Sequence, residues 1–322
     1  MDPATVYLRL VFMALLLCIN GLASAALDWS HVNPRQLGPR TWVVEHGPHE
    51  EPKSDSHGFH NNPGFVVTDD GIVVIDTGSS VEIGRMLLTK IAEVSDKPVT
   101  HVFTTHFHGD HWLGNQAIVE AYPNVHTIAH PEAIRLLGAG EDAFWVQRFS
   151  ELLGDDFAGT RAVIPASAAS EGELTIGGVR FDILLFDKAH TATDLMVYVR
   201  NDGVLFTGDV VNNAHCSFMG HGNFHGAIEA TRKAASLRPS HVVAGHGKSG
   251  GAELVDRYDA FYAALVAKVQ DHYDAGLEDY EMKPLVMKEL QEYRNWHNFD
   301  VQLGPYISQV ILEIESGLPV RP

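Results

Sequence analysis

Four apolar, strand-like runs in this chain are each followed, within a few residues, by a histidine or an aspartate. "HVFTT" precedes His106, "FDILLFD" precedes His190, "GVLFTG" precedes Asp209 and "HVVAG" precedes His246. In layered α/β proteins, ligand sites gather at the carboxyl ends of the strands. The pattern therefore predicts an α/β fold in which these four side chains meet at one edge of a sheet.

The segment "HFHGDH" adds further candidate ligands next to the first of these. His106 and His108 are two residues apart, so their rings point the same way if the segment is extended. Histidine is the commonest metal ligand in proteins. With a third nitrogen from His190, these residues could hold one cation.

A second cation could bind close by. Asp110 and His111 follow Gly109, where the chain can turn towards a second point, and His246 could complete the set. The two oxygens of Asp209 could bridge both cations. Nitrogen and carboxylate ligands without cysteine suit zinc, and would tolerate iron or manganese. We therefore expect two Zn²⁺ ions, with a shared water activated as bridging hydroxide at neutral pH.

The net charge of the chain limits the classes of molecule that it is expected to bind. Among 322 residues, 41 are acidic and 23 are lysine or arginine, which gives a formal net charge of -18. Such a surface repels phosphate backbones and anionic headgroups, so no nucleic-acid partner is expected. The expected partner is a small-molecule substrate. The oligomeric state is not readable from the sequence.

The first 25 residues are typical of a secretory signal peptide. Arg9 precedes an apolar run from Leu10 to Ile19, and a small-residue site for cleavage ends at Ala25. The run is too short for a good membrane span, so no stable anchor is expected after cleavage, with an uncleaved anchor as the alternative. Cys216 would then be the sole cysteine, without an internal disulfide. A periplasmic or secreted protein is predicted.

Strand and helix signals alternate along residues 26–250. Hairpin signals occur at "TDDG", "IGGV" and "RNDG", and helical spacing occurs in residues 80–92 and 141–153. From residue 251 onward the apolar residues recur at helical spacing, with further helical stretches near 284–293 and 304–316. The sequence predicts a body over residues 26–250 and a C-terminal helical extension over 251–322. The apolar stripe of that extension would cover the body or a second subunit.

Several motifs together resemble one known family. "GIVVIDTG", "THFHGDH", "DKAHTATDL", "LFTGDVV" and "VAGHG" are similar to the motif series of the metallo-β-lactamase superfamily. The resemblance covers residues 41–250. It implies a four-layer αβ/βα sandwich with a binuclear metal site at one edge, held by the ligands named above. It also implies that Asp76 supports the metal loop without binding metal itself.

Two positions indicate a branch of that family. Its β-lactamases usually have cysteine or serine at the place of Asp209, and one type has a substrate-gripping lysine at the place of Asn212. The chain instead resembles exported glyoxalase II-like zinc hydrolases, of the kind associated with sulfur oxidation or quinoprotein systems. This implies attack of hydroxide on an ester, thioester, lactone or amide carbonyl, with Asp110 as the catalytic residue that orients the nucleophile and takes its proton. A true or promiscuous β-lactamase is one alternative, and a periplasmic metal-binding or partner-binding protein without catalysis is another.

The loop "NNAHCSFMGHGNFHG", residues 212–226, is rich in histidine and glycine. It could line the pocket, hold an additional metal through its histidines and Cys216, or be an ordinary solvated loop. Residues near His57 and His60 could form the opposite wall. Substrate contacts are therefore predicted for His57, His60, Asn212, His215, His221 and His225.

Overall fold

The structure is a computed structural model that describes residues 27–45 and 56–317. The predicted signal peptide lies outside the described residues. Residues 27–32 fall in a separate unit, and the described chain from Asn33 onward forms one compact unit. In the part of the chain that is described, no helix combines the length and apolar character needed to cross a bilayer.

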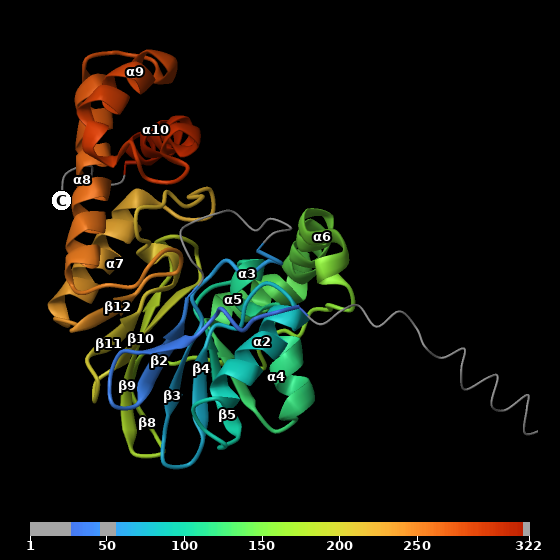
Figure 1. Ribbon diagram of the computed structural model, residues 1–322. Helices are drawn as coiled ribbons and strands as arrows, with labels where there is room; N and C mark the ends of the chain where they lie inside the picture. Colours follow the sequence, from blue (N-terminus) through green and yellow to red (C-terminus); the bar gives the residue numbers. More distant parts are fainter. Residues whose placement is uncertain (1–26, 46–55, 318–322) are drawn as a thin grey trace, which may run out of the picture. The chain divides into compact units, whose positions relative to one another are not determined.

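The first of two sheets contains seven strands that are hydrogen-bonded to one another in chain order. Figure 1 labels β2 to β5 of this sheet. Neighbours are antiparallel from β1 to β4 and parallel from β4 to β7. The β3–β4 pair is the hairpin that the sequence predicts around Gly71. The strands are β1 (Pro34–Gln36), β2 (Thr41–Val44), β3 (Gly64–Val67), β4 (Ile72–Ile75), β5 (Val99–Thr104), β6 (His126–Ala129) and β7 (Ser167–Ala168).

The second sheet contains five strands in the order β12-β11-β10-β9-β8. The predicted hairpins β8–β9 and β10–β11 are present, and β12 joins β11 in parallel. The strands are β8 (Gly172–Ile176), β9 (Val179–Phe186), β10 (Asp194–Val199), β11 (Val204–Phe206) and β12 (His241–Val243).

The two sheets pack face to face through their apolar side chains. One buried cluster contains Val66, Val73 and Phe103 from the first sheet together with Phe181 and Val197 from the second. These residues come from alternating strand positions, so each sheet keeps another face for helices. The cluster is the centre of a sandwich, as predicted.

Helices cover the outer face of the first sheet and the end near the metal loop (Figure 1). α2 begins after Ser80, whose hydroxyl accepts a hydrogen bond from the Ile83 amide at 3.2 Å. This is the usual way in which serine satisfies a free helix-start donor. The helices of this part are α2 (Val81–Ala92), α3 (Gly109–Trp112), α4 (Asn115–Ala121), α5 (Pro131–Leu136) and α6 (Asp142–Leu153).

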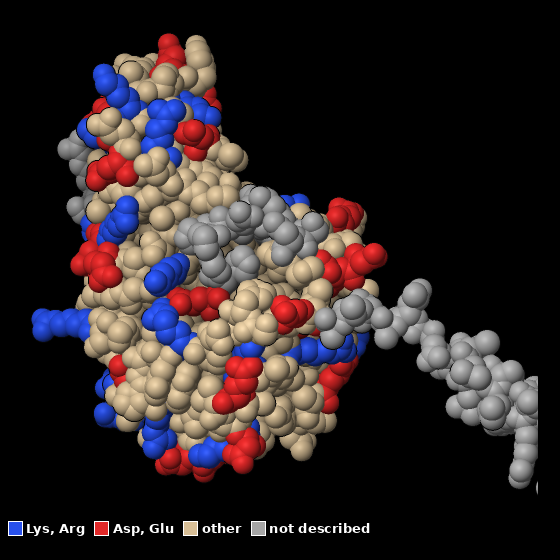
Figure 2. Space-filling view, in the orientation of Figure 1, with Lys and Arg blue, Asp and Glu red and all other residues tan. Residues whose placement is uncertain are grey.

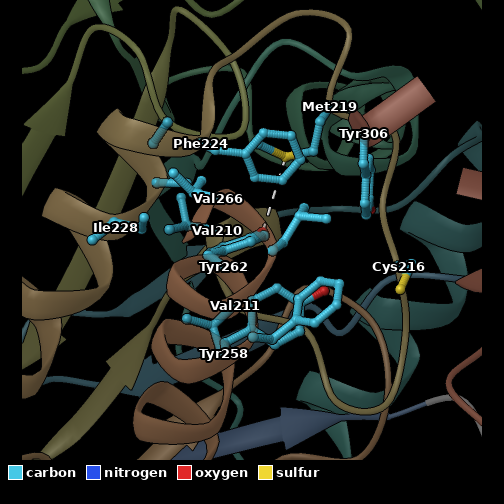
Figure 3. Close-up of a cluster of buried hydrophobic side chains, with 14 of the residues drawn as sticks. Val210, Val211, Cys216, Met219, Phe224, Ile228, Tyr258, Tyr262, Val266 and Tyr306 are labelled. Atoms are coloured by element: carbon cyan, nitrogen blue, oxygen red, sulfur yellow. Dashed lines mark hydrogen bonds between the residues drawn. The ribbon is translucent and has the colours of Figure 1, made fainter. Parts of the chain in front are cut away.

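The C-terminal helices cover the second sheet. An apolar cluster joins β10 and β11 to α7 and to the extension. Figure 3 shows Tyr262 and Tyr306 beside Phe224 in this cluster, with Tyr258 next to Tyr262. The aromatic stripe therefore packs on the body of its own chain. The helices are α7 (Phe224–Ser236), α8 (Glu253–Asp274), α9 (Asp279–Glu289) and α10 (Phe299–Glu315).

Two helices of the extension begin earlier than the sequence predicts. α9 begins at Asp279 after a capping box formed by Glu278 and Glu281, and Pro284 lies inside it. α10 likewise contains Pro305. A proline removes the hydrogen bond to the carbonyl four residues earlier. Those residues, Tyr280 and Val301, are strongly exposed, so water can satisfy their carbonyls and the helices continue.

Charged side chains are mixed on the surface in view. Figure 2 shows acidic and basic residues scattered among uncharged ones on that face, without an extended basic patch. Nothing on this face resembles the clustered Lys/Arg surface typical of nucleic-acid binding. The expected absence of a nucleic-acid partner stays a prediction.

Candidate metal centre

The loops that follow four strands place their ligand-type side chains at one end of the sandwich. β5 ends at Thr104 before His106, β9 ends at Phe186 before His190, β11 ends at Phe206 before Asp209, and β12 ends at Val243 before His246. Two of these strands, β11 and β12, are parallel neighbours, so their carboxyl ends coincide. The structure brings all seven candidate ligands together, from both sheets.

His106, His108 and His190 form the first donor group. Their ligand nitrogens lie within 4.8 Å of one another. His108 Nδ1 is 3.1 Å from His190 Nε2, and the rings of His106 and His190 are perpendicular. All three side chains are buried. Three nitrogens that converge in this way leave a fourth tetrahedral position open, as in catalytic zinc sites.

Asp110, His111 and His246 lie beside the first group. Asp110 Oδ2 is 3.5 Å from His111 Nε2 and 3.4 Å from His246 Nε2. Asp110 and His111 belong to α3, a short helix that starts at Gly109, where the chain turns as the sequence predicts. Two nitrogens and a carboxylate oxygen are suitable ligands for a divalent cation.

Asp209 lies between the two groups. Its Oδ1 is 3.2 Å from His111 Nε2, and its Oδ2 is 3.0 Å from His246 Nε2 and 3.6 Å from His190 Nε2. Each oxygen of one carboxylate therefore faces nitrogens that could serve a metal. This is the arrangement a bridging ligand needs.

The buried carboxylates of the centre need positive charge nearby to be stable in their ionised form. Burial raises the pKa of Asp209, but the His246 and His111 rings outweigh this effect and hold the pKa well below its ordinary value. Burial lowers the pKa of His111, but the carboxylates of Asp110 and Asp76 raise it well above the ordinary value. The imidazoles and the two central carboxylates thus favour each other's charged forms, and a bound cation would favour the carboxylates in the same way.

The donor set fits divalent cations. His106 Nε2 is buried and has no hydrogen-bond partner among the described residues, although a buried ring nitrogen normally has one. Burial and the neighbouring rings lower the pKa of His106 well below its ordinary value, so its nitrogens are available as ligands. The residues present fit a site for two divalent cations.

Neighbouring groups fix the orientation of the histidines. Asp76 Oδ2 accepts from His111 Nδ1 at 2.7 Å, and the same carboxylate accepts from the amide and hydroxyl of Thr105, both at 2.8 Å. Asp76 thus supports the metal loop, as the family resemblance implies. His108 Nε2 faces His221 Nδ1 at 2.9 Å, so His108 keeps Nδ1 for a metal. Such partners orient the ring and raise its basicity as a ligand.

A cavity of about 470 Å³ opens directly above the donors. This is within the usual range for small-molecule sites. One wall is the aromatic face of α6, and another is loop 212–223 with the start of α10. The lining side chains other than the expected metal ligands are His60, Phe144, Trp145, Arg148, Phe149, Leu152, His215, Cys216, Ser217, Phe218, His221, Asn298 and Gln302.

A family model described as "Metallo-beta-lactamase superfamily" matches residues 58–246, more than half of the chain. The chain belongs to the metallo-β-lactamase superfamily. Its described residues include a buried His/Asp cluster whose donor atoms could hold metal ions.

Two solved structures and one further relative show what this chain is similar to. A metallo-β-lactamase from Pontibacter korlensis is 20% identical with a TM-score of 0.56, over 72% of this chain and 98% of its own. A sec-alkylsulfatase from Pseudomonas sp. is 17% identical with a TM-score of 0.66, over 90% of this chain and 51% of its own. A linear primary-alkylsulfatase, also from Pseudomonas sp., is 42% identical over 50 residues, which are 16% of this chain and 10% of its own. The chain thus spans about half of the sec-alkylsulfatase.

Three of the predicted substrate residues, His60, His215 and His221, line the cavity of this metallo-β-lactamase fold. The other three have structural partners away from the lining. His57 pairs with Asp156 at 3.0 Å. Asn212 is buried, accepts from the His246 amide at 2.6 Å and donates to Ser217, so it holds the loop together.

His225 is the third residue away from the lining. Its Nδ1 lies 2.5 Å from the Glu313 carboxylate of α10. The additional metal site considered for the loop is not assembled either. Cys216 belongs to a buried apolar cluster (Figure 3). No loop histidine belongs to a donor group among the described residues.

Sequence reasoning missed the walls of the cavity. The aromatic face of α6 lies in a helix that the sequence predicts, but helical periodicity alone cannot distinguish a pocket wall from a core face. Asn298 and Gln302 lie at the start of α10. They belong to the C-terminal extension, for which only a packing role is predicted from the sequence. No local signal marks them, because they reach the cavity only through the packing of α10.

Proposed function

We propose that this chain is an exported, binuclear, zinc-dependent hydrolase of small molecules, of the glyoxalase II-like type. The observation that carries the proposal is the position of Asp209, whose two oxygens face nitrogens of both donor groups at 3.0–3.6 Å. An aspartate can bridge two cations symmetrically, unlike the cysteine or serine usual in the β-lactamase branches. Zinc suits the nitrogen and carboxylate donors.

When bound, a pair of divalent cations lowers the pKa of a water between them and so supplies a nucleophile at neutral pH. The chain's own residues would aim that nucleophile. Asp110 lines the cavity, and its pKa lies well below the ordinary value because the His111 and His246 rings outweigh the effect of burial. It is therefore anionic and can accept a hydrogen bond that orients the attacking group. Uptake of the proton by Asp110 is part of the proposal and does not follow from the lowered pKa. The target is the carbonyl of an ester, thioester, lactone or amide.

The side chains of the cavity wall are suited to a substrate that has an apolar part and an anionic part. Phe144 and Phe218 are each half exposed where they line the cavity, which is unusual for phenylalanine unless a ligand covers it. Arg148 is the one lysine or arginine among the lining residues, and it forms no ion pair with any described residue. A guanidinium in that position suits a carboxylate or another oxyanion.

A second candidate reaction is the hydrolysis of sulfate esters. The match to the sec-alkylsulfatase covers 90% of this chain and so includes helices of the extension, whereas the match to the β-lactamase covers 72%. An alkyl sulfate also combines an apolar chain with an anionic group. A panel of thioesters, lactones, carboxylic esters, alkyl sulfates and β-lactams separates the candidates. Turnover of sulfates alone favours the second reaction, and turnover of β-lactams alone favours a β-lactamase.

The test of the proposal is Asp209→Ala, with metal content and turnover measured on the same samples. The wild type should hold two zinc ions per chain, and the variant should lose at least one of them. Turnover should fall by roughly 100-fold or more, since removal of even an orienting partner of a ligand costs about 10–100-fold.

The control for that test is Asp187→Ala. Asp187 is exposed, pairs with His130 and is not among the residues that line the cavity. A wild type without bound metal and without turnover on the whole panel would favour a binding protein. Unchanged zinc and turnover in Asp209→Ala would remove the bridging role.

Export is supported by the sequence of residues 1–25. A tagged full-length chain expressed in a Gram-negative host should appear in the periplasmic fraction, and mass spectrometry should find an N-terminus at Ala26. An intact N-terminus in the cytosolic fraction would contradict export.

A further inference from the structure

His60 is not one of the seven expected metal ligands, but its side chain lies close to two of them. It lies in the segment between β2 and β3, and one of its donor atoms is within 4.8 Å of donor atoms of both Asp110 and His246. Its ring lies against the His246 ring, with centroids 4.2 Å apart and planes inclined by 43°. Two imidazoles and one carboxylate thus converge at the side of the centre that opens to the cavity.

The backbone holds His60 in this place. The Asn62 side chain is buried and donates to the carbonyls of Ala244 at 2.8 Å and Gly247 at 2.5 Å. The backbone N–H of Asn62 donates to the carbonyl of Gly245 at 3.0 Å. These bonds tie the segment that carries His60 to the segment that carries His246. The approach of the two rings is therefore built into the fold.

The main chain of His60 has a separate role that must be distinguished from that of its ring. The His60 carbonyl accepts from His246 Nδ1 at 3.2 Å, which leaves His246 Nε2 for a metal. This contact resembles the backbone partners that orient metal-binding histidines in general. It would persist with any side chain at position 60, so it does not explain why an imidazole is there.

We propose that the His60 ring is an additional ligand of the cation held by Asp110 and His246. The proposal rests on the proposed function only in requiring a cation at that position. A neutral imidazole adds a good donor for zinc or iron without adding charge to a centre that already contains two buried carboxylates. Because His60 also lines the cavity, its nitrogen occupies a coordination position next to the space for substrate.

His215 offers a useful comparison. Its ring stacks on the other side of His246, with centroids 5.2 Å apart and planes inclined by 23°. The donor groups among the described residues include His60 but not His215. A near-parallel stack is packing, whereas the tilted ring of His60 has a donor atom near Asp110. The structure therefore assigns the ligand role to His60 alone.

Two substitutions at position 60 separate coordination from packing. His60→Phe keeps a ring against His246 and keeps the backbone carbonyl, but removes the donor. His60→Asp restores a donor oxygen. The matched control is His57→Phe in the same segment, because His57 pairs with Asp156 and belongs to no donor group. Each metal-free variant is titrated with Co²⁺, with the visible absorption spectrum as readout and circular dichroism as the check of folding.

We expect His60→Phe to weaken one of the two Co²⁺ equivalents by at least about 10-fold and to change its spectrum, with the other equivalent unaffected. His60→Asp should bind much more tightly than His60→Phe, and His57→Phe should match the wild type. The proposal is overturned if His60→Phe binds both equivalents like the wild type, if it loses both while folded, or if His57→Phe is weakened equally. A wild type that binds a single cation contradicts only the binuclear proposal, and the effect of His60→Phe on that cation still decides the role of His60.

Discussion

At the residue scale, Gly245 sets the position of the bridging carboxylate. A Cβ atom at this position would lie 2.0 Å from Asp209 Oδ1 and 2.8 Å from the carbonyl of Gly208. Contacts this short cannot exist, so any side chain here must displace Asp209 or the backbone of its turn. The glycine in "VAGHG" is thus explained by the close approach of two segments that each carry a ligand.

We predict that Gly245→Ala lowers the metal content below two ions per chain and reduces turnover by at least about 10-fold, because ligand geometry is lost. The measurement is metal analysis of the purified variant together with its kinetics. Gly138→Ala is the control, since a Cβ at Gly138 would meet no atom within 4 Å. Equal metal content in both variants would contradict the prediction that metal binding depends on the position of Asp209.

At the scale of secondary-structure elements, the extension holds the loop that forms one wall of the cavity. The Tyr258 hydroxyl donates to the carbonyl of His215, and the Tyr306 hydroxyl donates to that of Ser217. Gln309 of α10 donates to the carbonyl of Gly222 at 3.4 Å. These bonds fix loop 212–223 at three points, so the shape of the cavity depends on helices that lie outside the matched family region.

Glu313 links α10 to the start of α7. It is 3% exposed, and its carboxylate accepts from the amides of Phe224 at 2.8 Å and His225 at 3.3 Å. A negative charge at a helix N-terminus is favourable, and buried donors that lose an acceptor are costly. We predict that Glu313→Gln lowers the free energy of unfolding by about 1–3 kcal/mol in urea denaturation. Glu315→Gln, at an exposed position of the same helix, should have almost no effect, and equal effects would contradict the role of Glu313.

At the scale of the whole molecule, the metal centre joins both sheets. His106 follows a strand of the first sheet, whereas His190, Asp209 and His246 follow strands of the second. Ions bound there would cross-link the halves of the sandwich and compensate buried carboxylates. Binding to the folded state alone stabilises it by roughly 3 kcal/mol at a free concentration 100 times the dissociation constant.

We predict that removal of metal by a chelator lowers the Tm by several degrees, and that added Zn²⁺ restores it in a concentration-dependent way. Differential scanning calorimetry measures both. The Asp209→Ala variant is the control, because its Tm should respond less to the chelator. A Tm of the wild type that is indifferent to chelator and zinc would contradict a metal that links the two sheets.

The sequence was enough to predict the fold class and the seven expected metal ligands. Strand signals come from local alternation and turn residues, and each donor follows an apolar strand directly. In an α/β sandwich the carboxyl ends of such strands meet, so His106, His190, Asp209 and His246 could be grouped without coordinates. Ligand chemistry requires particular residue types, and these are visible in the sequence.

The side chains that form the cavity are set by the packing of elements that lie far apart in the chain. His225 resembles His221 in its local sequence, yet Glu313, 88 residues away, takes His225 out of the lining. Asn298 and Gln302 reach the cavity because α10 packs beside loop 212–223, and His60 approaches Asp110 because Asn62 binds the backbone near His246. A polar side chain in a loop takes whatever partner the packing of distant elements brings to it, and that packing depends on long-range contacts that no local pattern records.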